Sequence, residues 1–413
     1  MKSTNYKIAF AHLTSRMKQT LVAVLSVTFG ISMYVAMNSF MHGVNDIQDD
    51  MAFSTLAHIR VYNDVPEDRT DLLATQVSDQ EVVHLRNPKV IQYTEGITNS
   101  QKYINFLENN PAVAVVAPEV NISMFFQNGA VKINGMLAGI DPVKNAEMFG
   151  TQEYVVEGNW EDLNYRQDGI IIGIGLAKKL SVSLNDNVFV LTADGVTKTY
   201  EVVAIFETSM KSVDNGKGYI RINSARQLLS KNMSYVTDIQ VNMKEYEKAQ
   251  AVATQISQNI PYKVESWQES NGQLVAGNEL RNIIALAVSL TILLVAGFGI
   301  YNIMNMTVNE KIREIAILKA MGFEGRDVVE IFLLQSIVIG VIGNLIGMGL
   351  GYLICVIVDN TPFVVGTMTS LPISYRAVDY VLAFIFGLAT TFLAGYLPAR
   401  KASQVDPVEI IRG

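Results

Sequence analysis

Four long uncharged runs constrain the fold of this 413-residue chain more than any other feature of its sequence. They cover residues 19–45, 282–309, 331–358 and 380–399. A helix needs about 20 apolar residues to cross the hydrocarbon core of a bilayer, so each run is long enough. Helices buried in a soluble core seldom stay uncharged over such lengths. We therefore predict four transmembrane helices.

The charged residues are concentrated between the first two runs. Residues 43–280 hold 19 Lys and Arg and 30 Asp and Glu, and the whole chain has a net charge of −7. Charged residues make up 17% of the chain, whereas soluble proteins average about 25%. This distribution excludes a simple soluble enzyme. Because the chain has no basic stripe to hold phosphates, we expect no nucleic-acid partner.

Basic residues in the short loops predict the orientation of the membrane helices, because such residues favour the cytoplasmic side. They precede the first run, separate the second from the third and follow the fourth: Lys2, Lys7, Arg16, Lys18, Lys311, Arg313, Lys319, Arg326, Arg400, Lys401 and Arg412. The remaining short loop, residues 359–379, has Arg376 alone. Both termini should therefore be cytoplasmic. The first run is long for a signal peptide and lacks a convincing cleavage site, which favours a membrane anchor.

The acidic block between the first two runs is predicted to be an α+β domain. Alternating apolar runs predict strands at residues 57–62, 112–116, 120–126, 131–138, 187–191 and 199–206. Helical patterns lie between them at residues 98–108, 175–180, 224–229 and 246–256. Asp194-Gly195 favours a hairpin, because this pair accepts the positive φ angle of a tight turn. Helix-forming sequence from Leu274 to Leu280 extends the second run upstream and predicts one long helix.

These features predict three segments. Residues 1–45 carry a cytoplasmic amphipathic segment and the first transmembrane helix, residues 46–279 form the α+β domain, and residues 280–413 hold the other three helices. The predicted fold class is thus an α-helical membrane protein with four transmembrane helices and a large α+β periplasmic domain inserted between the first and second.

No catalytic or metal-binding pattern stands out. The histidines show no i, i+4 pair of the kind that binds zinc, and Cys355 is the only cysteine. They are His12, His42, His58 and His84. Gly173 and Gly175 follow an apolar run, but Lys178 occupies the third glycine position of a dinucleotide-binding loop. We therefore expect no bound metal or cofactor and no enzymatic activity in this chain.

Two segments outside the acidic block show patterns that indicate more than a membrane helix. Residues 309–323 predict an amphipathic helix that ends at Gly322. Such a helix either rests on the membrane surface or docks a cytoplasmic partner that transmits force. In the third run the glycines at four-residue spacing predict close helix packing, although glycine is common in membrane helices. They are Gly343, Gly347 and Gly351.

The segment Glu310-Lys-Ile-Arg-Glu-Ile-Ala-Ile-Leu-Lys-Ala-Met-Gly322 strongly resembles FtsX/MacB-type ABC permeases, as does the chain end from Tyr396 to Glu409. The N-terminal half narrows the resemblance to lipoprotein-releasing (Lol-type) permeases. The motifs that carry it are Leu25-Ser-Val27, Met37-Asn-Ser-Phe-Met-His-Gly43, Ala138-Gly-Ile-Asp-Pro142, Gly169-Ile-Ile-Ile-Gly-Ile-Gly-Leu-Ala177 and Trp267-Gln-Glu-Ser-Asn-Gly272.

The resemblance implies a permease in the bacterial inner membrane that pairs with a second permease subunit and with a dimer of a separate ABC ATPase. ATP and magnesium would bind to that ATPase. Residues of the loop after the second run would couple to it: Glu310, Lys311, Arg313, Glu314, Lys319, Met321 and Gly322. ATP-driven motion would expel a lipoprotein towards a periplasmic carrier.

The same resemblance places a substrate cavity along the first two spans, in contact with membrane lipid. By position it nominates Met33, Met37, Phe40, Ile300, Met304 and Met306. Methionine suits acyl chains because its side chain adapts to irregular shapes, but ordinary helix packing or lipid contact would place the same residues there.

One departure from the Lol pattern leaves two possibilities for the second permease subunit. The chaperone-recruiting Lol subunit carries a long hairpin arm, whereas this chain has only the turn at Asp194-Gly195. The chain then corresponds to the substrate-handling partner subunit, or it forms a homodimer with a different carrier. Two other functions remain: a MacB-type efflux permease and an FtsX-like regulator of a cell-wall hydrolase.

Overall fold

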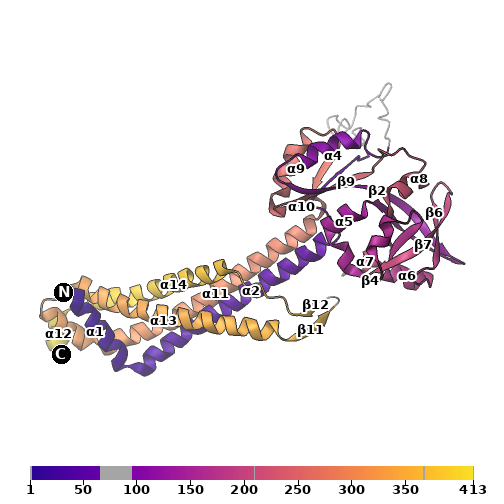
Figure 1. Ribbon diagram of the computed structural model, residues 1–413. Helices are drawn as coiled ribbons and strands as arrows, with labels where there is room; N and C mark the ends of the chain where they lie inside the picture. The colour runs from indigo at the N-terminus through magenta and orange to yellow at the C-terminus, as the bar shows by residue number, and fades with distance from the viewer. Residues whose placement is uncertain (1, 66–94, 209, 366–367, 413) are drawn as a thin grey trace, which may run out of the picture. The chain divides into compact units, whose positions relative to one another are not determined.

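The computed structural model describes residues 2–65, 95–208, 210–365 and 368–412 (Figure 1). His84 lies outside the described residues. The chain divides into two compact units. Residues 1–48 together with 276–413 form the helical unit, and residues 49–275 form the α+β unit.

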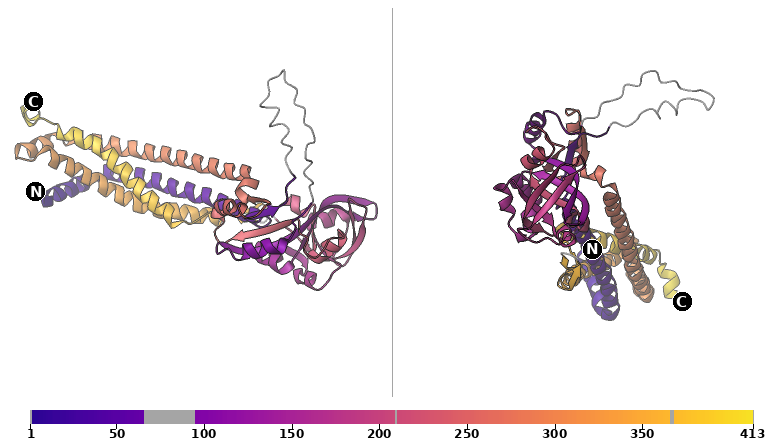
Figure 2. Two further views of the ribbon diagram at one scale, coloured as in Figure 1. Left: turned by 90° about the horizontal axis from the view of Figure 1, so that it is seen from above. Right: turned by 90° about the vertical axis from the view of Figure 1, so that its right-hand side faces the viewer.

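Within the described residues, four helices are long and apolar enough to cross a membrane, and they contain the four predicted runs. They are α2 (Met17–Phe53), α11 (Gly272–Glu310), α13 (Gly325–Asp359) and α14 (Ala377–Ser403). The shorter elements of the helical unit are α1 (Lys2–Ser15), α12 (Ile312–Ala320), α15 (Pro407–Arg412), β11 (Pro362–Val365) and β12 (Met368–Ser370). Figure 2 shows the long helices of this unit running side by side.

Local signals in the sequence explain several helix ends. A capping box at the start of α13 pairs the side chains of Glu324 and Asp327 with each other's backbone N–H groups, which satisfies donors that the first turn leaves free. The turn after α12 contains Gly322, whose φ of +100° confirms the predicted left-handed position. α11 begins at Gly272 and so includes the predicted upstream extension.

Glycines of α13 let α2 approach closely. A Cβ atom added at Gly343 would lie 2.6 Å from Cβ of Val27, and one at Gly347 would lie 2.8 Å from Cβ of Ile31. At Gly351 the corresponding contact is Val35, at 2.9 Å. Each β-branched side chain of α2 thus occupies the space that a side chain on α13 would need. Cys355 lies on the same helix and is buried.

The α+β unit contains a ten-stranded sheet in the order β10-β1-β9-β2-β3-β8-β5-β7-β4, with β6 paired to β2 and β7. Its strands are β1 (Ile59–Tyr62), β2 (Val113–Asn128), β3 (Val131–Ile140), β4 (Val155–Gly158), β5 (Gly169–Gly173), β6 (Asn187–Thr192), β7 (Thr197–Phe206), β8 (Lys217–Arg221), β9 (Asp238–Met243) and β10 (Lys263–Ser266). Its helices are α4 (Ser100–Glu108), α5 (Pro142–Phe149), α6 (Ile174–Leu180), α7 (Lys211–Asp214), α8 (Ile222–Leu228), α9 (Ala249–Ser257) and α10 (Trp267–Ser270).

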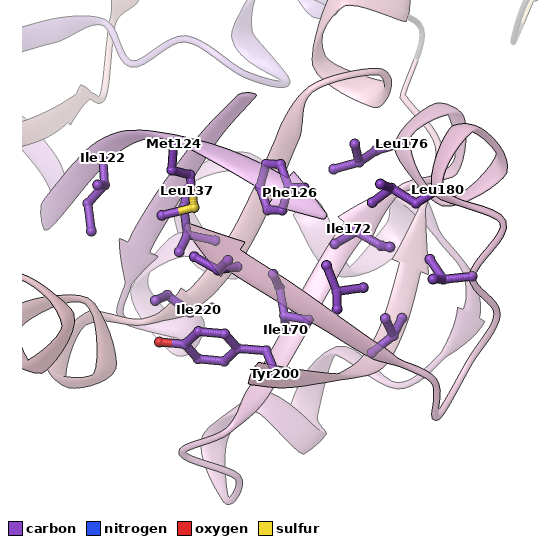
Figure 3. Packing of buried hydrophobic residues seen from close by; sticks show 14 of the residues in the cluster. Ile122, Met124, Phe126, Leu137, Ile170, Ile172, Leu176, Leu180, Tyr200 and Ile220 are labelled. Atoms are coloured by element: carbon purple, nitrogen blue, oxygen red, sulfur yellow. The ribbon is translucent and has the colours of Figure 1, made fainter. Parts of the chain in front are cut away.

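Strand β2 belongs to two hydrophobic cores. Near its start, Val113 and Val116 pack in a core with residues of α4, α9, β1 and β9. Further along, Met124 and Phe126 pack in a second core with β5, α6 and Tyr200 of β7 (Figure 3). One strand of 16 residues therefore runs through both cores.

The strand prediction needs several corrections. Residues 112–116 and 120–126 are parts of the single strand β2, because Pro118 stays in the ladder opposite Ile239 instead of ending the strand. The prediction also missed five strands of the sheet, β4, β5, β8, β10 and β9. The last of these, β9, pairs with β1 and β2 inside the sheet. Its sequence alternates polar and apolar residues, as a strand with one buried face should.

The predicted hairpin is confirmed as β6 and β7, which pair antiparallel from Asn187–Glu201 to Leu191–Thr197. Gly195 alone takes a positive φ, of +83°, among the turn residues. Asp194 therefore keeps an ordinary backbone conformation, so the turn differs from the two-residue type in which both central residues are left-handed.

His58 of the α+β unit lies in an aromatic cluster. Its ring centroid is 4.8 Å from that of Phe53 and 6.0 Å from that of Tyr246. Its Nδ1 atom accepts a hydrogen bond of 2.9 Å from the backbone N–H of Met243. Burial lowers the pKa of His58, so the folded unit favours the neutral ring.

We expect this unit to lose stability as the pH falls below about 6.5, the ordinary pKa of histidine. The unfolded chain then binds a proton that folded His58 resists, so the contribution is fully present above that pH and lost below it. The two tryptophans of the chain, Trp160 and Trp267, both lie in this unit, so their fluorescence reports its unfolding. In His58→Gln this part of the pH dependence should vanish; an unchanged dependence would contradict the assignment.

Candidate functional site

Helix α12 lies in the segment that the sequence predicted to be an amphipathic helix. It occupies residues 312–320, the middle of the predicted segment 309–323. Glu310 instead ends α11, and Met321 with Gly322 forms the turn before α13. In Figure 1, α12 lies near both chain ends.

One face of α12 is attached to the end of α14. Ile315 is buried in the same apolar cluster as Ala399 and Ala402 of α14, and the neighbouring Ala316 is also buried. Lys319 Nζ donates hydrogen bonds to the backbone oxygens of Ser403, at 3.0 Å, and Val405, at 2.7 Å. A cation at carbonyl groups that a helix end leaves free is favourable.

The acidic residues around the start of α12 contact the N-terminal part of the chain. Glu310 forms an ion pair with Arg16 Nη1 at 3.1 Å and accepts hydrogen bonds from Gln19 Nε2 at 3.3 Å. Glu314 lies 3.5 Å from His12 Nε2 and pairs with Lys311 Nζ at 2.6 Å. The segment around the start of α12 is therefore held by His12 of α1, by Gln19 of α2 and by Arg16 between them.

The opposite face of α12 is open. Arg313, Ile317 and Met321 follow one another at four-residue spacing and so share one face. Arg313 is exposed, and Ile317 and Met321 are 52% and 66% exposed. A cation followed by two apolar side chains forms a compact surface on which another protein can dock.

The structure divides the seven predicted coupling residues by their contacts. Four of them make hydrogen bonds or ion pairs within the helical unit: Glu310, Lys311, Glu314 and Lys319. Arg313, Met321 and Gly322 are exposed. Ile317 was not among the predicted coupling residues, although its four-residue spacing from Arg313 and Met321 indicated a shared face. The contacts of His12, Arg16 and Gln19 were not predicted either, because the local sequence has no signal for them.

The six predicted cavity residues do not share one surface. Ile300 and Met304 are fully buried in the apolar cluster of the helical unit. Met33 and Met306 are exposed, and Met37 and Phe40 are half-buried. For Ile300 and Met304, contact with a substrate would therefore require a rearrangement of the helices.

Two protein families match the chain. Residues 20–259 match the MacB-like periplasmic core domain, and residues 286–407 match the FtsX-like permease C-terminal domain. The first match covers more than half of the chain. The chain therefore belongs to the family with a MacB-like periplasmic core domain, and it is an ABC transporter permease of the FtsX/MacB-like superfamily, as the sequence predicted. It is a multi-pass inner-membrane protein with a periplasmic domain.

Individual relatives show which permeases of this superfamily the chain is similar to. The lipoprotein-releasing system transmembrane protein LolC of Neisseria meningitidis serogroup B is 27% identical over 76% of this chain and 82% of its own length. LolC of Xylella fastidiosa (strain Temecula1) is 25% identical over 73% of this chain and 78% of its own. The macrolide export protein MacB of Azoarcus sp. is 33% identical, over 42% of this chain and 26% of its own. The predicted resemblance to Lol-type permeases is confirmed.

Proposed function

We propose that this chain is the permease subunit of an ABC transporter that extracts lipoproteins from the outer leaflet of the inner membrane. A dimer of a separate ATPase drives it, a second permease subunit completes it, and a periplasmic carrier receives the lipoprotein. The observation that carries this proposal is the similarity to LolC, which covers about three quarters of both chains.

The proposed topology has both termini in the cytoplasm and the α+β domain inserted between the first and second spans. The basic residues near the chain ends and around α12 support this orientation. In this arrangement α12 faces the cytoplasm, where the ATPase binds. ATP and magnesium belong to that partner, and this chain supplies the surface that the partner moves.

The contacts of α12 describe how motion would pass into the membrane. The exposed face of Arg313, Ile317 and Met321 would receive the ATPase. The inner face is bonded to α14 through Lys319, and α12 is joined by short turns to α11 and α13. A displacement of α12 would therefore move the cytoplasmic ends of several membrane helices together.

The exposed and half-buried members of the predicted cavity are the ones suited to acyl chains. Met33, Met37, Phe40 and Met306 offer flexible or broad apolar side chains at the helix surface. Ile300 and Met304 would support them from within the helical unit. Membrane lipid would occupy the same surface when no substrate is bound.

A photo-crosslinking residue at Met37 tests lipoprotein extraction. We expect the complete transporter in native membranes to yield a lipoprotein adduct at Met37 that decreases when ATP is added. The matched control is Leu350, an apolar residue of α13 that is also accessible and lies outside the predicted cavity. It should capture phospholipid. Phospholipid at both positions would contradict lipoprotein extraction.

The match to MacB supports a second candidate, an efflux permease that drives periplasmic substrates through an outer-membrane duct. An FtsX-like regulator, which passes ATP-driven motion to a cell-wall hydrolase, is the third. Affinity purification of the complex separates them, because a copurified duct protein or hydrolase would replace the periplasmic carrier as partner.

A further inference from the structure

The N-terminal helix α1 is docked inside the helical unit. Ala9 and Leu13 are buried. Asn5 Nδ2 donates to Asp327 Oδ1 at 3.3 Å and to Glu330 Oε2 at 3.1 Å, both near the start of α13. α1 is followed after a single residue by α2, so the position of α1 and the start of the first span are directly linked.

His12 connects α1 to both α12 and α13. Its Nε2 atom lies 3.5 Å from Glu314 Oε2 of α12, and its Nδ1 atom lies 3.0 Å from Gln335 Nε2 of α13. Its ring also faces that of Phe332, with centroids 6.2 Å apart. The side chain of His12 is only 10% exposed, so these neighbours define its surroundings.

The protonation state of His12 suits this position. Burial lowers its pKa, and so does the nearby cation of Lys311, while Glu314 opposes them. The ring is therefore neutral near pH 7. Because the Gln335 amide nitrogen can only donate, Nδ1 accepts, and the proton of the neutral ring lies on Nε2, facing the carboxylate of Glu314.

A second connection lies one turn further along the chain. Arg16 pairs with Glu310 at 3.1 Å, and Gln19 donates to both oxygens of the same carboxylate. Exposed ion pairs alone stabilise by less than about 1 kcal/mol. The Arg16–Glu310 pair matters because of its position. Arg16 lies between α1 and α2, and Glu310 lies just before α12.

We propose that His12 and Arg16 are positioning residues that latch the start of the first span to α12, so that motion of α12 is passed to α2 as well as to α11. The proposal rests on the proposed function only in taking α12 as the element that the ATPase moves. Without the latch, α12 keeps its chain connections to α11 and α13 and its bonds to α14, and Gln19 still donates to Glu310. The contact of His12 with Glu314 and the ion pair of Arg16 with Glu310 are lost.

The test uses the complete transporter in nanodiscs, with spin labels on cysteines introduced at Phe29 of α2 and Leu393 of α14, both exposed. A non-hydrolysable ATP analogue should change the distance between the labels in the parent protein. In each of the two single variants, His12→Ala and Arg16→Glu, we expect that distance change to be lost, while ATP hydrolysis continues. Release of a fluorescent acylated lipoprotein should fall by about tenfold or more, the range of coupling between distant sites.

Two further variants separate a latch from a general structural role. Arg16→Glu combined with Glu310→Arg restores the ion pair with its charges exchanged, so it should regain the distance change and release. Asn5→Ala removes contacts of α1 with α13 but none with α12, so it should behave like the parent. Equal damage from Asn5→Ala, or no rescue by the exchange, would overturn the assignment.

The outcomes also separate this inference from the proposed function. A nucleotide-dependent distance change that depends on the latch, without lipoprotein release in the parent, would support the latch and reject lipoprotein extraction. A distance change that persists in His12→Ala and Arg16→Glu, or that is absent in the parent, would reject the latch whatever the substrate is.

Discussion

Replacing Gly347 with leucine is expected to prevent the helical unit from folding. An added Cβ would lie 2.8 Å from Cβ of Ile31 and 2.9 Å from the backbone oxygen of Thr28. A backbone atom cannot move aside as a flexible side chain can, so α2 must separate from α13. Overpacking costs about 1–3 kcal/mol even for smaller insertions, and a leucine at this contact should exceed that range. Membrane yield and a single symmetrical peak in size-exclusion chromatography measure the result.

The same helix provides the matched control. Gly349 has nothing within 4 Å of its added Cβ, so Gly349→Leu should express and elute like the parent protein. Both variants carry the same side chain in the same helix, which cancels effects of helix propensity and hydrophobicity. If both variants were equally well folded, the close approach of α2 and α13 in this region would be wrong.

Reversing the exposed face of α12 is expected to abolish ATP-driven transport. In Arg313→Glu combined with Ile317→Glu, two carboxylates replace a cation and an apolar contact at the proposed docking surface. Losing central contacts of an interface commonly costs 2 kcal/mol or more, roughly a thirtyfold loss of affinity. The ATPase should fail to copurify, and lipoprotein release should stop.

An exposed lysine elsewhere in the helical unit serves as the control. Lys401→Glu reverses a charge on α14, where Lys401 is exposed and makes no contact with the open face of α12 among the described residues. It should retain the ATPase. Lys311 is a poor target for the same purpose, because its side chain is 14% exposed and pairs with Glu314. Full ATPase binding by the Arg313 and Ile317 double variant would remove the docking surface from the proposal.

Local composition was enough to predict the four membrane helices and the β6–β7 hairpin. The uncharged runs are longer than soluble helices allow, and Asp194-Gly195 favours a turn in the sequence alone. The four-residue spacing likewise indicated which glycines of α13 share a face. These features can be predicted because each depends on residues that are close to one another in the sequence.

Contacts between distant residues left no such signal. Lys319 was predicted to face a partner, yet its ammonium group bonds to Val405, 86 positions away. His12 and Glu314 are separated by about 300 positions, so neither residue could reveal the other. Met304 and Met306 look alike in sequence, but only the helix arrangement places the first in the core and the second at the surface. β9 was missed although its alternation was visible, because its polar residues outweighed a short apolar pattern.

Strand β2 has a mechanical consequence for the periplasmic domain. Its 16 residues contribute to both hydrophobic cores, and its ladder to β9, β3 and β6 continues along its length. The ladder changes partner from β9 to β3 between Glu119 and Val120, so β2 itself continues from the first core into the second. We therefore expect a force applied to one core to reach the other through the backbone of this one strand.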